Sequence, residues 1–257
     1  MNNTAMNANA SSPPQYRIAG RLSKEDLTLI DTGGEFAERI RKLFADSRPK
    51  KIIETGTYFG TGTTTIIANT IKALAIEDAT FYSIEVNPRH YSKALAHITR
   101  EGLNVKPLNG LSVPRSLLPS RAEIEQRYVS SVLADQLIVD HEPDQRTEFY
   151  FRETDFPHLQ DDLLGQILAE FGNKADFVLL DSGGHMGYVE FQYLTSKLRS
   201  PCWIALDDIF HVKHHLSFKD IETDPRFVIE TVSREKFGFC IARFTPAARS
   251  KRKENAA

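Results

Sequence analysis

Residues 51–62, which read KIIETGTYFGTG, decide the fold class of this chain. Lys51–Ile53 are predicted to end a buried β-strand, and the acidic Glu54 follows directly. A turn with three glycines comes next, and a run of threonines then opens a helix. In parallel α/β sheets, a strand that runs through a glycine turn into a helix brings bare backbone against a nucleotide-like ligand. The stretch therefore predicts an α/β fold with a ligand site at this turn.

The turn differs from the fingerprint of dinucleotide-binding proteins. That fingerprint has a glycine at the place that Thr65 takes here, and it assigns no role to an acidic residue such as Glu54. A carboxylate beside a tight turn suits a ligand with ammonium or hydroxyl groups better than it suits a pyrophosphate. S-Adenosylmethionine has these features, because it combines an amino-acid tail with a cationic sulfur.

A second acidic residue ends the next predicted strand. Thr80–Ile84 is a short apolar run, and Glu85 follows it about one βαβ unit beyond the turn. A carboxylate at this place is positioned to accept hydrogen bonds from a ribose diol. Taken alone, Glu85 could equally be a solvated strand-end residue, but the preceding turn favours the ligand role.

Two motifs together resemble a known family. Glu54-x-Gly-x-Tyr-x-Gly, followed by Ile84-Glu85-Val86-Asn87-Pro88, resembles the class I S-adenosylmethionine-dependent methyltransferases. The likeness is greatest to the cation-dependent O-methyltransferases of the catechol type and to sugar-modifying relatives such as macrocin O-methyltransferase. It covers residues 35–110 and 175–245 and fails between them. The resemblance implies that the cofactor is held by Glu54, Gly56, Tyr58, Gly60, Glu85, Gly110, Ser112 and Asp181.

The resemblance implies a Rossmann-like, doubly wound sheet of seven strands whose last strand is antiparallel. Two continuous apolar runs fit strands buried on both faces, and a stretch with helical spacing lies between them. Two further strands near the end of the chain fit the sixth strand and the reversed seventh. These segments are 175–180, 202–206, 188–198, 224–228 and 237–244.

Three carboxylates are expected at the carboxyl edge of this sheet. Asp181 follows the first of the two apolar runs, and Asp207 and Asp208 follow the second. Converging carboxylates repel one another unless a cation lies among them, and all-oxygen ligands favour Mg²⁺. The resemblance assigns these three residues to a metal that would hold the acceptor hydroxyl and lower its pKa. The alternative is that Asp181 and Asp207 are strand-end residues that contact the cofactor or cap a helix.

The general base is less well defined by the sequence. The positions that carry the base in the related enzymes are Gly183 and Gly184 here. His185 is therefore the first candidate, because a histidine titrates near neutral pH, and His211 and His214 after the Asp pair come second. His211 and His214 also have the spacing of two zinc ligands on one helix face, although no cysteine or further ligand accompanies them.

Composition is typical of one enzyme domain. The chain has 257 residues, 41% of them hydrophobic, and a formal net charge of -2 that offers no basic field for nucleic acid. The two cysteines lie in predicted core strands and are expected to be reduced, which favours a cytoplasmic protein. No apolar stretch is long enough to cross a membrane, and the first residues lack the pattern of a signal peptide.

The segment between the third and fourth strands is longer than the family core requires. Residues 113–160 are predicted to form an inserted α/β flap, with a helix at 121–133, short strands at 136–139 and 147–152, and a turn at Pro143-Asp144 between them. Residues 161–171 would supply the expected helix. The flap would be a lid whose residues Tyr150, Arg152 and His158 contact the acceptor, or it would be an arm for a homodimer. The methyltransferase domain is placed at 21–247, with disordered tails at 1–20 and 248–257.

These observations predict a transferase that methylates a hydroxyl on a small molecule, of a sugar or natural-product type, with the help of Mg²⁺. A metal-independent methyltransferase acting on nitrogen or oxygen is the first alternative. A nicotinamide-dependent Rossmann oxidoreductase is the second, although the missing third glycine disfavours it. A protein that binds the cofactor without catalysis is the third.

Overall fold

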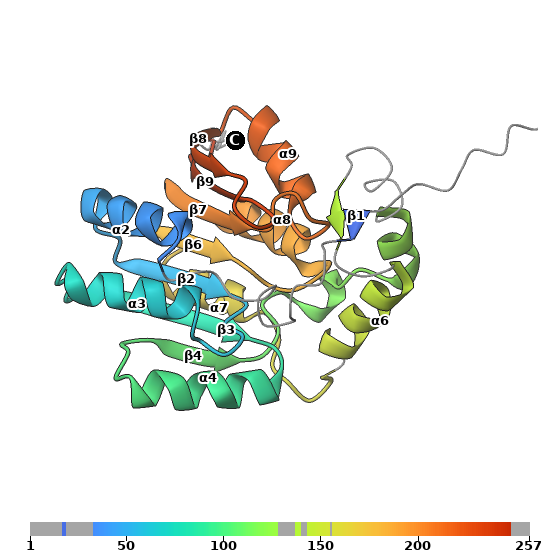
Figure 1. Ribbon diagram of the computed structural model, residues 1–257, viewed down its shortest axis with the longest axis horizontal. Helices are drawn as coiled ribbons and strands as arrows, with labels where there is room; N and C mark the ends of the chain where they lie inside the picture. Colours follow the sequence, from blue (N-terminus) through green and yellow to red (C-terminus); the bar gives the residue numbers. More distant parts are fainter. Residues whose placement is uncertain (1–16, 19–32, 128–136, 140–142, 155, 248–257) are drawn as a thin grey trace, which may run out of the picture.

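A seven-stranded sheet forms the centre of the molecule (Figure 1). The computed structural model describes residues 17–18, 33–127, 137–139, 143–154 and 156–247. The strands are arranged in the order β4-β3-β2-β6-β7-β9-β8. Their bounds are β2 Lys51–Thr55, β3 Thr80–Glu85, β4 Lys106–Asn109, β6 Phe177–Leu180, β7 Cys202–Asp207, β8 Phe227–Ser233 and β9 Phe239–Phe244.

The last two strands have the predicted reversal. The first five strands pair in parallel, whereas β9 runs antiparallel to both of its neighbours, β7 and β8. The chain thus passes β7, forms the edge strand β8, and returns to fill the place between them. The expected sheet of seven strands with an antiparallel last strand is confirmed.

Helices cover both faces of this sheet. One apolar core joins α2 and α3 to the sheet, and a second joins α7, α8 and α9 to the opposite side of β6. Successive side chains of β6 alternate between these cores, and all four are fully buried. The helix bounds are α2 Glu35–Ser47, α3 Thr63–Ala73, α4 Pro88–Arg100, α7 Leu163–Glu170, α8 Met186–Lys197 and α9 His215–Thr223.

The inserted segment differs in part from its prediction. Residues 121–127 are helical as expected, and 128–136 lie outside the described residues. The short strand β5 (Ile138–Val139) pairs in parallel with β1 (Arg17–Ile18) and does not form a hairpin with 147–152. The predicted strand at 147–152 is wrong, because these residues belong to the helix α6 (Pro143–Thr154).

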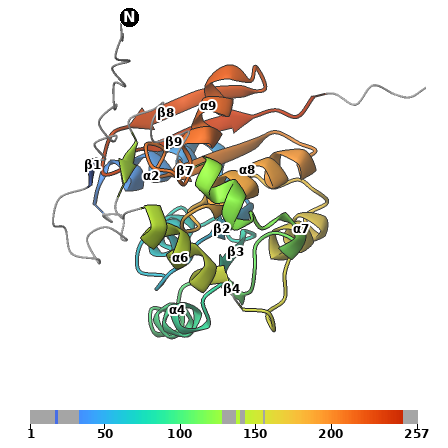
Figure 2. The ribbon, with the colours of Figure 1, turned by 90° about the vertical axis from the view of Figure 1, so that its right-hand side faces the viewer.

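The physical reason lies in the spacing of the buried side chains of α6. Thr147, Tyr150 and Thr154 are buried and recur at three- and four-residue intervals, which is the period of a helix. Tyr150 packs against Met186 and Val189 at the start of α8. In Figure 2, which looks onto the carboxyl ends of the parallel strands, α6 lies in front of the sheet.

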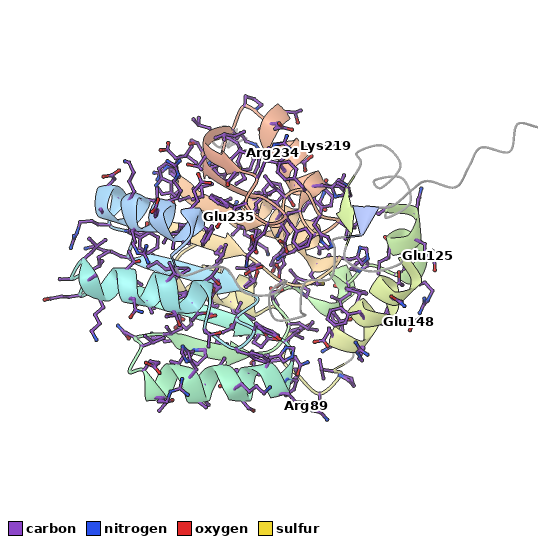
Figure 3. All side chains as sticks on the ribbon, in the orientation of Figure 1. Arg89, Glu125, Glu148, Lys219, Arg234 and Glu235 are labelled. Atoms are coloured by element: carbon purple, nitrogen blue, oxygen red, sulfur yellow. The ribbon has the colours of Figure 1, made fainter. Side chains whose placement is uncertain are left out.

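Charged side chains of both signs are spread over the surface. Arg89 on α4, Glu148 on α6 and Lys219 on α9 are exposed and well separated (Figure 3). Both cysteines, Cys202 and Cys240, are buried and free, as the sequence predicts. Within the described parts of the chain, no helix has the length and apolar character needed to span a bilayer. The predicted tails at 1–20 and 248–257 lie outside the described residues, except for Arg17–Ile18.

Candidate active site

The glycine turn (residues 56–62) joins β2 to α3 at the carboxyl edge of the sheet. Gly56, Tyr58 and Gly60 all have positive φ, of 85°, 52° and 73°. A Cβ at Gly56 would lie 2.3 Å from the carbonyl oxygen of Asp181, so this position admits only glycine. The backbone N–H of Gly56 donates to the carbonyl of Ile84 at 2.9 Å. The turn is therefore held between the ends of β3 and β6.

Glu54 lies beneath this turn and is fully buried. Its carboxylate accepts hydrogen bonds from the hydroxyls of Thr63, Thr64 and Ser83, the last two at 2.6 Å. Burial raises the pKa of Glu54 to about 7. The carboxylate ties the first turn of α3 to β2 and β3. The structure thus gives Glu54 a supporting role through three hydroxyls that the sequence pattern did not connect, and its predicted contact with the cofactor stays a prediction.

Glu85 ends β3 beside the turn, as predicted. Its carboxylate accepts the backbone N–H groups of Tyr58 at 2.7 Å and Asn87 at 2.8 Å. The Tyr58 ring stacks on Phe59 with centroids 3.8 Å apart, and His90 meets both rings edge-on. Glu85 and the glycine turn therefore form one continuous polar edge with an aromatic cluster behind it.

Gly110 and Ser112 lie on the next segment, after β4. The N–H of Gly110 donates to the carbonyl of Glu85 at 3.1 Å, and a Cβ at Gly110 would lie 2.5 Å from the carbonyl oxygen of Gln160. Ser112 is buried, and its hydroxyl donates to Glu190. Gly110 thus borders the edge at Glu85, whereas Ser112 points to a buried carboxyl.

Glu190 is a buried residue that the sequence analysis missed. It lies on α8 with no exposed surface, and it accepts the hydroxyls of Thr55 and Ser182 at 2.8 Å in addition to that of Ser112. Burial raises the pKa of Glu190. The available signal is its spacing, since it lies four residues after the buried Met186 and so on the apolar face of the helix.

The structure brings the three predicted metal ligands together. Asp181 follows β6, Asp207 ends β7, and Asp208 comes next with a φ of 61° that is unusual for a residue with a side chain. One carboxylate oxygen from each lies within 4.8 Å of the others, and the three residues are partly buried. Burial and the charges of Asp208 and Asp181 raise the pKa of Asp207 well above its usual value. We call these residues the acidic trio.

A lysine of the chain contacts this trio directly. The ammonium nitrogen of Lys213 donates to Asp181 and to Asp208, the latter at 3.0 Å, and the lysine side chain is only 5% exposed. Burial alone would lower the pKa of Lys213, but the surrounding carboxylates raise it above its usual value. The acidic trio therefore has a cationic partner from within the chain, a role that the sequence analysis did not assign.

The candidate bases are both buried near α8 and α9. His185 immediately precedes α8, and its ring meets Tyr150 edge-on at 5.9 Å. His211 accepts the backbone N–H of Lys213 on Nδ1 at 3.3 Å and lies against Phe237. The only group of three His, Cys, Asp or Glu residues with metal-ligand spacing in the described ranges is the acidic trio, so the zinc interpretation of His211 gains no support.

His214 has a structural role. Its Nδ1 lies 3.1 Å from the hydroxyl of Ser217. Its ring packs against Gly187, so closely that a Cβ on this glycine would lie 2.6 Å from Cε1 of the ring. Burial, with the charge of Lys213 as a further cause, holds the pKa of His214 well below its usual value. This packing anchors the segment that carries Lys213 to α8.

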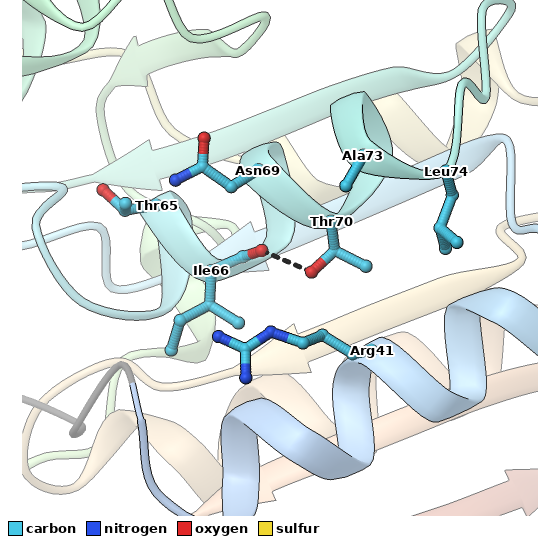
Figure 4. A pocket seen from close by; sticks show the side chains of 7 residues that line it. All are labelled: Arg41, Thr65, Ile66, Asn69, Thr70, Ala73 and Leu74. Atoms are coloured by element: carbon cyan, nitrogen blue, oxygen red, sulfur yellow. Dashed lines mark hydrogen bonds between the residues drawn. The ribbon is translucent and has the colours of Figure 1, made fainter.

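The residues that line two surface hollows include none of the acidic trio and none of the glycine turn. One lies between α2 and α3 and is shown in Figure 4, where the hydroxyl of Thr70 donates to the carbonyl of Ile66 at 2.7 Å. The other lies between α8, α9 and the start of β8. Neither contains a predicted site residue.

Comparison with solved structures identifies the fold. The chain is similar to a putative caffeoyl-CoA O-methyltransferase from Staphylococcus aureus, with a TM-score of 0.52, 13% identity, and coverage of 86% of this chain and 87% of that one. It is equally similar to an O-methyltransferase from Bacillus cereus in complex with SAH, with a TM-score of 0.52, 14% identity, and 86% of each chain covered. The chain has the Rossmann-like methyltransferase fold.

A third neighbour with this methyltransferase fold is TomG from Streptomyces achromogenes, an O-methyltransferase of tomaymycin synthesis solved in complex with SAM. Its TM-score is 0.50 at 13% identity, with 86% of this chain and 83% of that chain covered. No family model and no curated protein sequence matches the chain. At such low identities the likeness establishes the methyltransferase fold, and the chemistry has to be argued from the site.

Proposed function

We propose that this protein is an S-adenosylmethionine-dependent methyltransferase that acts on a hydroxyl group of a small molecule. The observation that carries this proposal is the position of the glycine turn, Glu85 and the acidic trio at one edge of a methyltransferase sheet. Ligands of doubly wound sheets bind outside the carboxyl ends of the strands. Two of the similar structures have SAH or SAM bound, which supports the same ligand class here.

The residues at this edge fit the cofactor. Each oxygen of the Glu85 carboxylate accepts one backbone N–H, which leaves acceptor capacity for two ribose hydroxyls. Positive φ at Gly56 and Gly60 folds the turn tightly at this edge, and its backbone would face the ligand. The carboxylates of the trio would face the cationic end of the ligand. S-Adenosylmethionine, when bound, supplies a methyl group activated by a positively charged sulfur.

The remaining residues would orient the acceptor and remove its proton. His185 is the proposed base, because an imidazole accepts a proton near neutral pH and the residue directly follows the loop after Asp181. His211 is the alternative on the other side of Lys213. The inserted segment would bound the acceptor site. Tyr150 is buried within it, whereas Arg152 and His158 are exposed and remain the candidates for contacting an acceptor.

The acidic trio would be the binding site of the expected Mg²⁺, but a lysine of the chain already contacts it. Asp181, Asp207 and Asp208 are the residues that would hold the ion, and it would lower the pKa of the acceptor hydroxyl. Lys213 contacts two of these carboxylates, and this contact favours the alternative of a metal-independent transfer. A nicotinamide cofactor is disfavoured, since Thr65 replaces the third glycine of the fingerprint and β9 is reversed.

The setting of the reaction is part of the same proposal. Two free, buried cysteines suit the reducing cytoplasm, and the net charge of -2 suits a small-molecule substrate better than a nucleic acid. The inserted segment would also serve a homodimer if it acts as an arm.

The test is calorimetric titration of S-adenosylhomocysteine into the wild-type protein and two variants. We expect micromolar binding to the wild type and binding weaker by about tenfold or more in Glu85→Ala, since each factor of ten corresponds to about 1.4 kcal/mol. The matched control Glu77→Ala changes an exposed glutamate near the opposite end of β3 and should bind like the wild type. Absence of binding to the wild type would refute the proposal. Binding would lead to a transfer assay with catechols and sugars as acceptors.

A further inference from the structure

We propose that the ammonium group of Lys213 takes the place of the divalent cation at this edge, so that the protein needs no metal ion. The part of this inference that concerns methyl transfer rests on the proposed function. The part that concerns metal binding depends only on the chain itself.

The contacts of Lys213 are those of a cation at the centre of the acidic trio. Its nitrogen donates to Asp181 and lies 3.0 Å from Asp208, and these residues come from the ends of two neighbouring strands. The lysine side chain is 5% exposed, whereas the side chains of Asp181 and Asp208 are 18% and 21% exposed. The lysine side chain is therefore more buried than the two carboxylates that it contacts. A Mg²⁺ ion bonded to the same oxygens, at about 2.1 Å, would have to share this space with the nitrogen.

The backbone around Lys213 fixes the lysine in this place. Its N–H donates to His211, and its carbonyl oxygen would lie 2.6 Å from a Cβ at Gly187. The same glycine accommodates the ring of His214. On the other side, the N–H of His211 donates to the carbonyl of Asp208 at 3.1 Å. The lysine is thus packed between α8 and the loop of the Asp pair, and its withdrawal would disturb both.

The expected consequence is a defined role in the transfer. An ammonium has three N–H donors, of which two point to carboxylates, and the third would donate to the oxygen of the acceptor. That oxygen forms a bond to the methyl carbon while the bond from sulfur to methyl breaks. The electron pair of the broken bond goes to sulfur, and the hydroxyl proton goes to the imidazole of His185. Lys213 then contacts the acceptor directly and stays protonated throughout.

The experiment compares Mn²⁺ binding by calorimetry and thermal unfolding in three proteins. Lys213→Met keeps most of the length of the side chain and removes its charge, and Lys174→Met changes an exposed lysine in the loop before β6 as the control. We expect the wild type and the control to bind no Mn²⁺ at micromolar concentrations and to unfold at an unchanged temperature when it is added. Lys213→Met should bind Mn²⁺ at least about tenfold more tightly and unfold at a higher temperature in its presence.

Two results would overturn the inference. One is a binding result, either micromolar Mn²⁺ binding by the wild type or no stronger binding by a folded Lys213→Met. The other is loss of methyl transfer by the wild type in EDTA. If Lys213→Met does not fold, the Mn²⁺ titration of the wild type decides, with binding against the inference and no binding for it. Failure of S-adenosylhomocysteine to bind would refute the proposed function, while the Mn²⁺ comparison would still test the place of Lys213.

Discussion

Two buried carboxyl groups, those of Glu54 and Glu190, lie near the glycine turn. Glu54 and Glu190 have no exposed surface, and hydroxyl groups donate to both of them. Burial raises the pKa of each, because the charged form loses its hydration. Such residues hold the turn in place through hydrogen bonds, yet they make the stability of the fold depend on pH.

The raised pKa of Glu54 indicates how the stability of the fold changes with pH. Its pKa rises from 4.5 to about 7 on folding, so its stabilising contribution is full below pH 4.5 and is lost as the pH rises through about 7. The loss is on the order of 3 kcal/mol. In Glu54→Gln this site does not titrate, so the wild type should lose stability relative to the variant as the pH rises from about 5 to 8.

The measurement is urea unfolding of both proteins at several pH values in that range. Glu77→Gln, which changes an exposed carboxyl, should keep the pH dependence of the wild type. Parallel curves for the wild type and Glu54→Gln would contradict the prediction, because they would show that Glu54 is already ionised in the folded protein at about pH 5.

At the scale of elements, α8 determines where the loops of the candidate site lie. His185 precedes this helix, Glu190 binds three hydroxyls from its middle, and Gly187 receives the segment 213–214. Glycine is normally unfavourable within a helix, because its helix propensity is low. Here the glycine permits a close approach of backbone and an imidazole ring.

Gly187→Ala should therefore destabilise the protein although alanine favours a helix. The new methyl group would meet the carbonyl of Lys213 and the ring of His214 at 2.6 Å, and overpacking of this kind costs about 1–3 kcal/mol. The matched variant Gly183→Ala places its methyl group in open space and should change stability by less than about 0.5 kcal/mol. Urea unfolding checks both, and equal stabilities would contradict the packing described for α8.

At the scale of the whole molecule, one sheet separates two cores. Leu179 belongs to the core with α2 and α3, and Leu180 belongs to the core with α7 and α8. Both side chains have no exposed surface. Since the same strand contributes to both cores, damage on either face should weaken the whole domain.

Leu179→Ala and Leu180→Ala are each expected to lower the free energy of unfolding by about 2–5 kcal/mol. Each variant should still unfold in a single transition by fluorescence and by circular dichroism. Val228→Ala on the edge strand β8, where the side chain is 68% exposed, should change stability by less than about 0.5 kcal/mol. Separate transitions for the two faces would show that the cores unfold independently.

The local features of this fold could be predicted because they depend on residues close together in the chain. The glycine turn, the acidic residues at the ends of β3, β6 and β7, and the buried strands follow from turn chemistry and apolar spacing. The antiparallel direction of the last strand, β9, was predicted from the family resemblance and is confirmed. The helix α6 was mistaken for a strand, because a short run with aromatic residues fits either period until its buried face is known.

The partners of the site residues were decided only by the tertiary structure. Ser83 meets Glu54 across 29 positions of the chain, Ser112 meets Glu190 across 78, and Lys213 meets Asp181 across 32. Sequence spacing missed Glu190 on α8, but for Glu54 and Asp181 it placed each carboxylate at the correct edge of the sheet. It did not reveal which cation or hydroxyl would reach that carboxylate, because this depends on how separate elements pack against one another in space.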